Sequence, residues 1–95
     1  MDKTEAHGIL AEQLAPYRLR SYFDLVRMIG SNDVVEVRGA SGTEYQVEIE
    51  VTCDSPRDKV NVRVMGGIDD GHFVSSLAPL CDSFSMAPDG KLIGE

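Results

Sequence analysis

Apolar residues in the N-terminal part of the chain recur at the spacing of α-helices. In the first segment, Thr4 is the expected N-cap and the residues Ile9, Leu10 and Leu14 are the expected core positions. Pro16 is expected to end or kink this helix, because proline has no backbone N–H to donate.

A second helical segment is predicted from Ser21 onward. Ser21 is followed three residues later by Asp24, an arrangement similar to a capping box, and Gly30 is the expected C-terminal stop. The apolar face predicted for this segment consists of Leu19, Tyr22, Phe23, Val26 and Ile29, with Leu25 and Met28 beside it. Residues 1–30 are therefore predicted to form one helix or two helical segments.

From Val34 onward the period of the apolar residues changes to two, which is typical of strands with one buried face. The clearest alternation lies in the segment whose apolar positions are Tyr45, Val47, Ile49, Val51 and Cys53. Shorter alternating runs begin at Val34 and at Val60, and a turn is expected at Gly39–Gly42. The sequence thus predicts three successive strands here.

The C-terminal third is less regular. Gly66-Gly67 predicts a bulge or a bend within the third strand, and His72–Leu77 is a possible fourth strand. Another alternating run begins at Leu80, with Asp82 on its apolar side, and the turn Pro88-Asp89-Gly90 precedes a short last strand.

The predicted fold is a single α+β domain over residues 1–95. Residues 1–30 are helical, and residues 34–95 form an antiparallel β-meander of four to six strands. An amphipathic helix and a sheet with one apolar face each need a cover, so the helix is expected to pack on the sheet.

The net charge of −7 bears on the class of partner. The whole excess lies in residues 31–95, which hold five basic and twelve acidic residues. An acidic surface repels phosphate backbones, so direct nucleic-acid binding is excluded. The acidity is typical of simple solubility, which is preferred, or of a protein that binds a basic partner or mimics a nucleic acid.

The cysteine content and hydropathy favour a cytoplasmic protein. The N-terminal residues contain no apolar signal-peptide core, and no run is long enough to span a membrane. Cys53 and Cys81 lack the spacing of zinc ligands and are interpreted as reduced thiols.

Asp69, Asp70, Gly71 and His72 admit two interpretations, a metal site or a tight turn. Hard cations need more oxygen ligands than this segment offers, and Asp-Asp-Gly is typical of turns, so the turn is preferred. No nucleophile elbow, Walker motif or dinucleotide fingerprint is present. The sequence therefore predicts no catalytic residues, no metal, no cofactor and no enzymatic activity.

Several motifs in residues 34–95 carry a resemblance to a known group of proteins. They are GTEYQVEIEV (Gly42–Val51), VRVMGGIDDG (Val62–Gly71), Pro79-Leu80 and FSMAPDGKLIGE (Phe84–Glu95). In these motifs the chain resembles a family of small uncharacterised bacterial proteins, some of which are carried on mobile gene cassettes. The family pattern has a basic residue after the aromatic that follows Asp-Asp-Gly, whereas here Val74 follows Phe73. The resemblance implies no activity.

Three functional hypotheses follow from the sequence. The first is a protein-binding or self-associating module, expected as a homodimer, because a meander exposes strand edges. The second is a small apolar ligand bound between helix and sheet by Phe23, Tyr45 and Phe84. The third is an acidic inhibitor or antitoxin that contacts a basic site through Glu44, Glu48 and Glu50.

Overall fold

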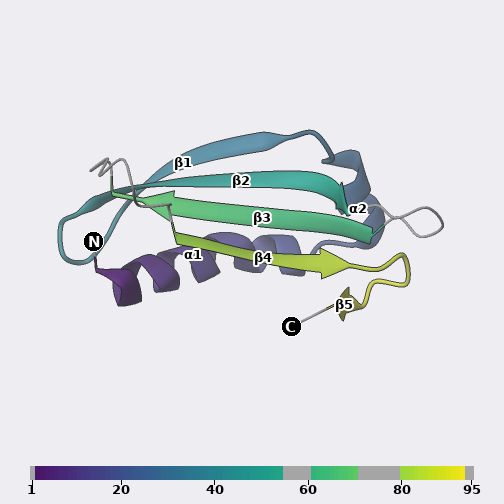
Figure 1. Ribbon diagram of the computed structural model, residues 1–95, viewed down its shortest axis with the longest axis horizontal. Helices are drawn as coiled ribbons and strands as arrows, with labels where there is room; N and C mark the ends of the chain where they lie inside the picture. Colours follow the sequence, from purple (N-terminus) through teal and green to yellow (C-terminus); the bar gives the residue numbers. More distant parts are fainter. Residues whose placement is uncertain (1, 55–60, 71–79, 94–95) are drawn as a thin grey trace.

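The computed structural model describes residues 2–54, 61–70 and 80–93. Figure 1 shows that two helices precede a five-stranded antiparallel sheet, which confirms the predicted α+β arrangement. The strands follow one another in the order β1-β2-β3-β4-β5. The elements are α1 (Lys3–Arg18), α2 (Tyr22–Arg27), β1 (Asn32–Arg38), β2 (Glu44–Asp54), β3 (Asn61–Asp69), β4 (Leu80–Met86) and β5 (Leu92–Ile93).

The N-cap of the first helix lies two residues before the predicted one. Asp2 is the N-cap, and its side chain accepts a hydrogen bond of 3.1 Å from the backbone N–H of Glu5, so the assignment of Thr4 was wrong. Pro16 lies in the last turn, and the helix ends at Arg18. The buried residues are Ala6, Leu10 and Leu14, which recur every four residues and form one stripe along the helix.

The start of α2 is as predicted, and its apolar face is confirmed in part. Ser21 Oγ accepts a hydrogen bond of 3.1 Å from the backbone N–H of Asp24. Leu25 is buried, and Tyr22 and Val26 pack against the core. Leu19 and Phe23 are 88% and 69% exposed, so their assignment to the buried face was wrong. Leu19 precedes α2 and is not helical, so it does not share a helix with the residues grouped with it.

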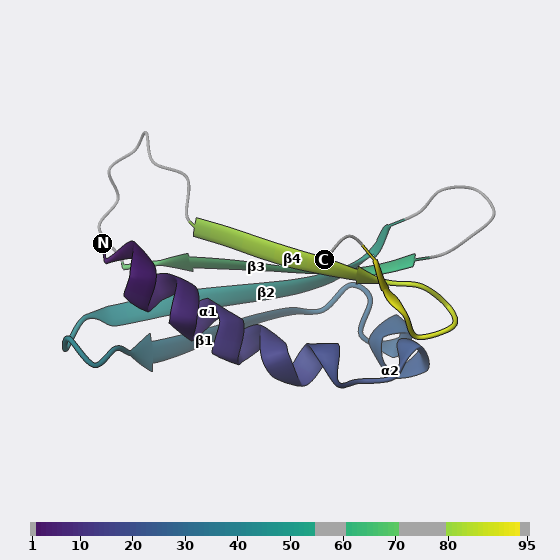
Figure 2. The same cartoon turned by 90° about the horizontal axis from the view of Figure 1, so that it is seen from below.

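The sheet buries one face against α1 (Figure 2). Side chains at alternate positions of β2, β3 and β4 point to this face, as a period of two requires. Together with the α1 stripe and Leu25, they form one core. The buried strand residues are Tyr45, Val47, Ile49, Val51, Val62, Val64, Ile68, Phe84 and Met86.

The glycine pair in β3 does not form the predicted bulge or bend. The register is unbroken, since Gly66 pairs with Ile49 on one side and with Asp82 on the other. A Cβ atom at Gly66 would lie 2.8 Å from Cδ1 of Leu10, so the absent side chain lets α1 approach the sheet closely. Asp82, out of place in the sequence pattern, lies beside Gly66 and within 4.0 Å of Arg18 Nη2.

The turn before the last strand is confirmed. The N–H of Ala87 donates to the carbonyl of Lys91, and Gly90 has a φ of 88°, a value that favours glycine. The short strand β5 then pairs with the end of β4. The possible strand at residues 72–77 and the turn residues Gly71 and His72 lie outside the described residues.

Candidate interaction surface

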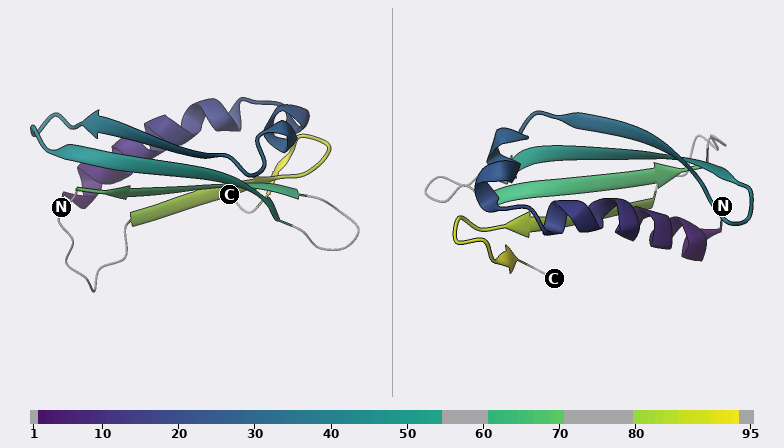
Figure 3. Two further views of the ribbon diagram at one scale, coloured as in Figure 1. Left: turned by 90° about the horizontal axis from the view of Figure 1, so that it is seen from above. Right: turned by 180° about the vertical axis from the view of Figure 1, so that it is seen from behind.

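The sheet face opposite α1, here called the open face, is a candidate interaction surface. Figure 3 shows both described helices on one side of the sheet and none on the other. The register of the strands places side chains of all five strands on this face. Its members include Asn32, Val34, Glu36, Arg38, Glu44, Gln46, Glu48, Glu50, Arg63, Met65, Gly67, Cys81, Ser83, Ser85 and Ile93.

The three glutamates proposed from the sequence as a partner contact, Glu44, Glu48 and Glu50, are exposed in a row along the open face of β2. Arg38 Nη2 lies 4.0 Å from Glu44 Oε1, and Asn32 Nδ2 donates to Glu48 Oε2 at 3.0 Å. These exposed contacts leave most of the carboxylate row in water, so its negative charge is available to a partner.

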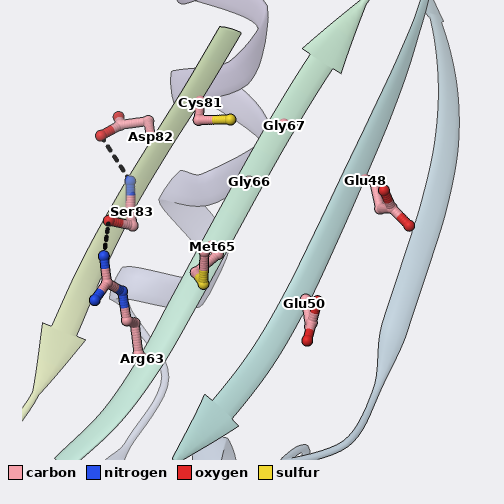
Figure 4. Close-up of a pocket in the computed structure, with 9 residues that line it drawn as sticks. All are labelled: Glu48, Glu50, Arg63, Met65, Gly66, Gly67, Cys81, Asp82 and Ser83. Carbon is pink, nitrogen blue, oxygen red and sulfur yellow. Dashed lines mark hydrogen bonds between the residues drawn. The ribbon is translucent and has the colours of Figure 1, made fainter. Parts of the chain in front are cut away.

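A shallow groove of about 400 Å³ crosses the open face (Figure 4). Its lining is Glu48, Glu50, Arg63, Met65, Gly66, Gly67, Cys81, Asp82 and Ser83. Gly67 lies between Glu48 and Cys81 in the strand register. A Cβ atom there would have no neighbour closer than 4.0 Å, so the missing side chain hollows the surface between these residues.

The groove offers both hydrogen-bond donors and acceptors. Arg63 Nη2 donates to Ser83 Oγ at 3.4 Å, while the buried Nε of Arg63 has no acceptor among the described residues. The carboxylates of Glu48 and Glu50 line the opposite wall (Figure 4). This arrangement suits a partner that presents a cationic side chain and a hydrogen-bond acceptor side by side.

The residues predicted to line an apolar pocket do not gather. Phe23 is exposed on α2, so its assignment to a pocket between helix and sheet is wrong, whereas Tyr45 and Phe84 are buried in the core. Phe84 lies in register with Val51, six residues from Tyr45 along β2, which separates the two backbones by about 20 Å. Arg18 also covers the Phe84 ring, with Cζ 5.0 Å from its centroid.

A cluster around Glu5 was not found by the sequence analysis. Glu5 Oε1 accepts hydrogen bonds of 2.7 Å from both the Tyr45 hydroxyl and Ser41 Oγ, and Oε2 accepts from the Ser41 backbone N–H at 3.0 Å. The cluster joins the start of α1 to the turn between β1 and β2. No sequence signal reveals it, because Ser41 is 36 positions from Glu5.

The hydrogen bonds of this cluster shift two pKa values in opposite directions. Bonds from Ser41 and then Tyr45 stabilise the charged carboxylate and hold the pKa of Glu5 below its ordinary value of 4.5. The bond to Glu5, with burial as the next cause, raises the pKa of Tyr45 to about 12. The role of the cluster is structural, because its hydrogen bonds hold the start of α1 against the turn between β1 and β2.

The described residues hold no group of three or more side chains suited to a metal ion. Of the segment considered as a metal site, Asp69 ends β3 and Asp70 follows it, while His72 lies outside the described ranges. Cys53 and Cys81 are both exposed, and neither forms a disulfide. Within the described ranges, no helix is long and apolar enough to cross a membrane.

Comparison with known proteins returned no matching family model, no matching curated protein and no matching solved structure. The resemblance of residues 34–95 to small bacterial proteins stays a prediction.

Proposed function

We propose that this chain is a protein-binding module, with no catalytic role, whose open face binds a basic segment of a partner. The observation that carries this proposal is a sheet face that no described helix covers, with Glu44, Glu48 and Glu50 in a row beside a groove. An apolar sheet face is usually buried in the core, whereas a polar face can remain in contact with water. The open face is polar and contains a groove.

The spacing of the glutamates favours an extended partner segment. Glu48 and Glu50 are two residues apart on one strand, which separates them by about 7 Å. Alternate side chains of an extended peptide have the same separation, so a basic-x-basic segment can meet both carboxylates. Met65, exposed between Glu50 and Ser83 in the register, supplies an adaptable apolar contact at the centre.

The same contacts serve an inhibitor or antitoxin, in which the open face occupies a basic site on another protein. A small apolar ligand is not favoured, because the residues proposed for its pocket are separated or exposed. We place the module in the cytoplasm, where exposed thiols outside a disulfide, such as those of Cys53 and Cys81, stay reduced.

The test compares Glu50→Lys with Glu12→Lys. Both change the net charge equally, but Glu50 lines the groove, whereas Glu12 is exposed on α1. Proteins captured from the native host by the tagged chain are identified by mass spectrometry and then titrated individually as purified partners. Partners bound by the wild type and Glu12→Lys are expected to bind Glu50→Lys at least tenfold more weakly, which is about 1.4 kcal/mol.

The result that would refute the open face as the contact surface is equal affinity of every purified partner for all three proteins. Far-UV circular dichroism of each variant controls for folding. A partner whose interface shows no basic residues would also contradict the proposed electrostatic complementarity.

A further inference from the structure

β1 is an edge strand of seven residues, and its outer side pairs with no described strand. β1 pairs with β2 on one side through all seven residues, and no described element lies beyond it on the other (Figure 1). The opposite edge of the sheet is formed by β5, which has two residues. The two edges therefore differ in their capacity to pair with another strand.

The direction of the outer backbone groups follows from the hydrogen bonds that flank β1. The N–H of Gly39 donates to the carbonyl of Thr43, and the N–H of Val51 donates to the carbonyl of Ser31. In an antiparallel pair, bonded and non-bonded positions alternate, so the odd-numbered residues of β1 bond to β2. The N–H and C=O groups that point outward belong to Asn32, Val34, Glu36 and Arg38.

Several of the features that usually block edge pairing are missing from β1. The strand contains no proline, no lysine and no bulge, and its register with β2 is continuous. Asp33, its charged residue on the α1 side, accepts a hydrogen bond of 3.1 Å from the Tyr17 hydroxyl. Val34 and Val35 are 53% and 39% exposed, one on each face of the sheet.

We propose that β1 pairs antiparallel with β1 of a second copy of this chain, about a two-fold axis at Val35. This register pairs Val34 with Glu36 of the second copy and Asn32 with Arg38, all residues whose backbone groups point outward. Each such pair exchanges two backbone hydrogen bonds. The two sheets then form one continuous sheet, and the contact is isologous, as a closed dimer requires.

The side chains select this register over its neighbours. Residues that pair across the two strands lie on the same face of the sheet. The two-fold axis must therefore place one residue opposite its own copy, because an axis between two consecutive residues would pair side chains from opposite faces. An axis at Glu36 would place two glutamates directly opposite each other, and an axis at Val34 would pair only five residues. The axis at Val35 pairs all seven and puts Val35 against Val35 of the second copy.

The proposed dimer does not depend on the proposed function, because the β1 edge and the Glu48–Glu50 groove are separate surfaces. The first experiment measures molar mass by light scattering after gel filtration, over a series of concentrations. The mass is expected to rise from that of the 10.4 kDa chain toward twice this value. A constant monomer mass up to high micromolar concentration overturns the proposal.

Two variants locate the interface. Val34→Pro removes an outward N–H without removing a bond to β2, and Val35→Lys brings two ammonium groups together at the axis. Each is expected to weaken dimerisation at least tenfold. Ala11→Lys, which adds the same charge at an exposed position of α1 and away from β1, is expected to change it far less. A dimer that persists in both folded β1 variants overturns the assignment to this edge.

Disulfide trapping tests the register in a background with Cys53→Ser and Cys81→Ser. At the axis, two residues at position 35 form a non-hydrogen-bonded pair with Cα atoms about 4.5 Å apart, within disulfide range. Val35→Cys is expected to give a covalent dimer on mild oxidation. Arg38→Cys is the control, because its two copies lie about 20 Å apart in this register. Trapping by Arg38→Cys and not by Val35→Cys overturns the register.

Discussion

At the scale of single residues, Glu5 connects parts of the chain that are distant in sequence. Its carboxylate accepts three hydrogen bonds, from Tyr45 and from two groups of Ser41. Gly39 makes room for it, since a Cβ atom there would lie 2.6 Å from Glu5 Oε1. The start of α1 is thus fixed to the turn between β1 and β2 by a charged group.

Glu5→Gln is expected to lower the melting temperature at neutral pH by several degrees. The pKa of Glu5 is lowered in the folded state. The contribution of Glu5 to stability is therefore present above pH 4.5 and is lost as the pH falls through the pKa of the folded state. The pKa of Tyr45 is raised to about 12, so the contribution of Tyr45 is present below 10 and is lost as the pH rises toward 12.

The difference in melting temperature between wild type and Glu5→Gln should therefore shrink below pH 4.5 and again above pH 10. Thermal unfolding followed by circular dichroism across this range measures it. Glu12→Gln, on the exposed side of the same helix, is the control and should show no such profile. A difference that stays constant with pH would contradict stabilisation of the fold by the ionised carboxylate of Glu5.

The adjacent residues Gly66 and Gly67 give a second prediction, because they point to opposite faces of β3. Gly66→Ala pushes a methyl group against Leu10, and overpacking of this kind costs about 1–3 kcal/mol. Gly67→Ala brings its methyl group no closer than 4.0 Å to any neighbour and should be neutral or stabilising by up to about 1 kcal/mol. Urea unfolding of both variants measures the free energies, and equal effects would contradict the assigned faces.

At the scale of elements, α1 is held to the sheet by its buried stripe. Leu10 and Leu14 are fully buried and contact the sheet where Gly66 leaves space. The first helix therefore depends on long-range packing as much as on its own capping by Asp2.

Leu10→Ala is expected to lower the free energy of unfolding by about 2–5 kcal/mol, because it leaves a cavity between α1 and β3. Leu19→Ala is the matched control. Leu19 is 88% exposed, so its truncation should change the free energy by no more than about 0.5 kcal/mol. Chemical unfolding of both variants measures the difference. A cost at Leu19 similar to that at Leu10 would indicate that the predicted apolar face of α2 is buried after all.

The elements that local patterns could predict are those defined by neighbours in the sequence. The alternation centred on β2 predicted that strand and its buried face, and Ser21 with Asp24 predicted the start of α2. The features that the sequence did not predict correctly depend on tertiary contacts. The role of Gly66 requires knowing that Leu10 lies above it, and the groove beside Gly67 exists only once three strands are in register.

The candidate surface was predicted only in part. The glutamates at Glu44, Glu48 and Glu50 follow from the period of β2, so their common face could be read from the sequence. Their juxtaposition with Arg63 and Ser83 depends on the pairing of β2 with β3 and of β3 with β4. The exposed position of Phe23 depends on which side of α2 faces the sheet, and the spacing of its apolar residues does not determine this.

At the scale of the whole molecule, the chain is elongated, with extents of 43 × 26 × 22 Å, and its sheet offers two separate surfaces. The open face attracts cations, whereas the β1 edge is paired mainly through the backbone in the proposed dimer. Each copy carries a net charge of −7, so two copies repel each other at long range. The two proposed interactions must therefore respond to salt in opposite directions.

Raising the salt concentration is expected to strengthen the dimer and to weaken binding of a basic partner. At about 0.1 M salt the screening length is about 10 Å, which reduces repulsion between the two acidic copies while leaving backbone hydrogen bonds nearly unchanged. The two Glu36 carboxylates flank the proposed axis diagonally, about 7–8 Å apart, and add to this repulsion. Glu36→Gln should therefore reduce the salt dependence of the dimer.

Sedimentation velocity at low and high salt measures the strength of dimerisation, and titration calorimetry measures the affinity of the open face for a purified partner. A dimer that weakens with salt would show that charge pairs hold it together, which contradicts pairing of β1 through its backbone.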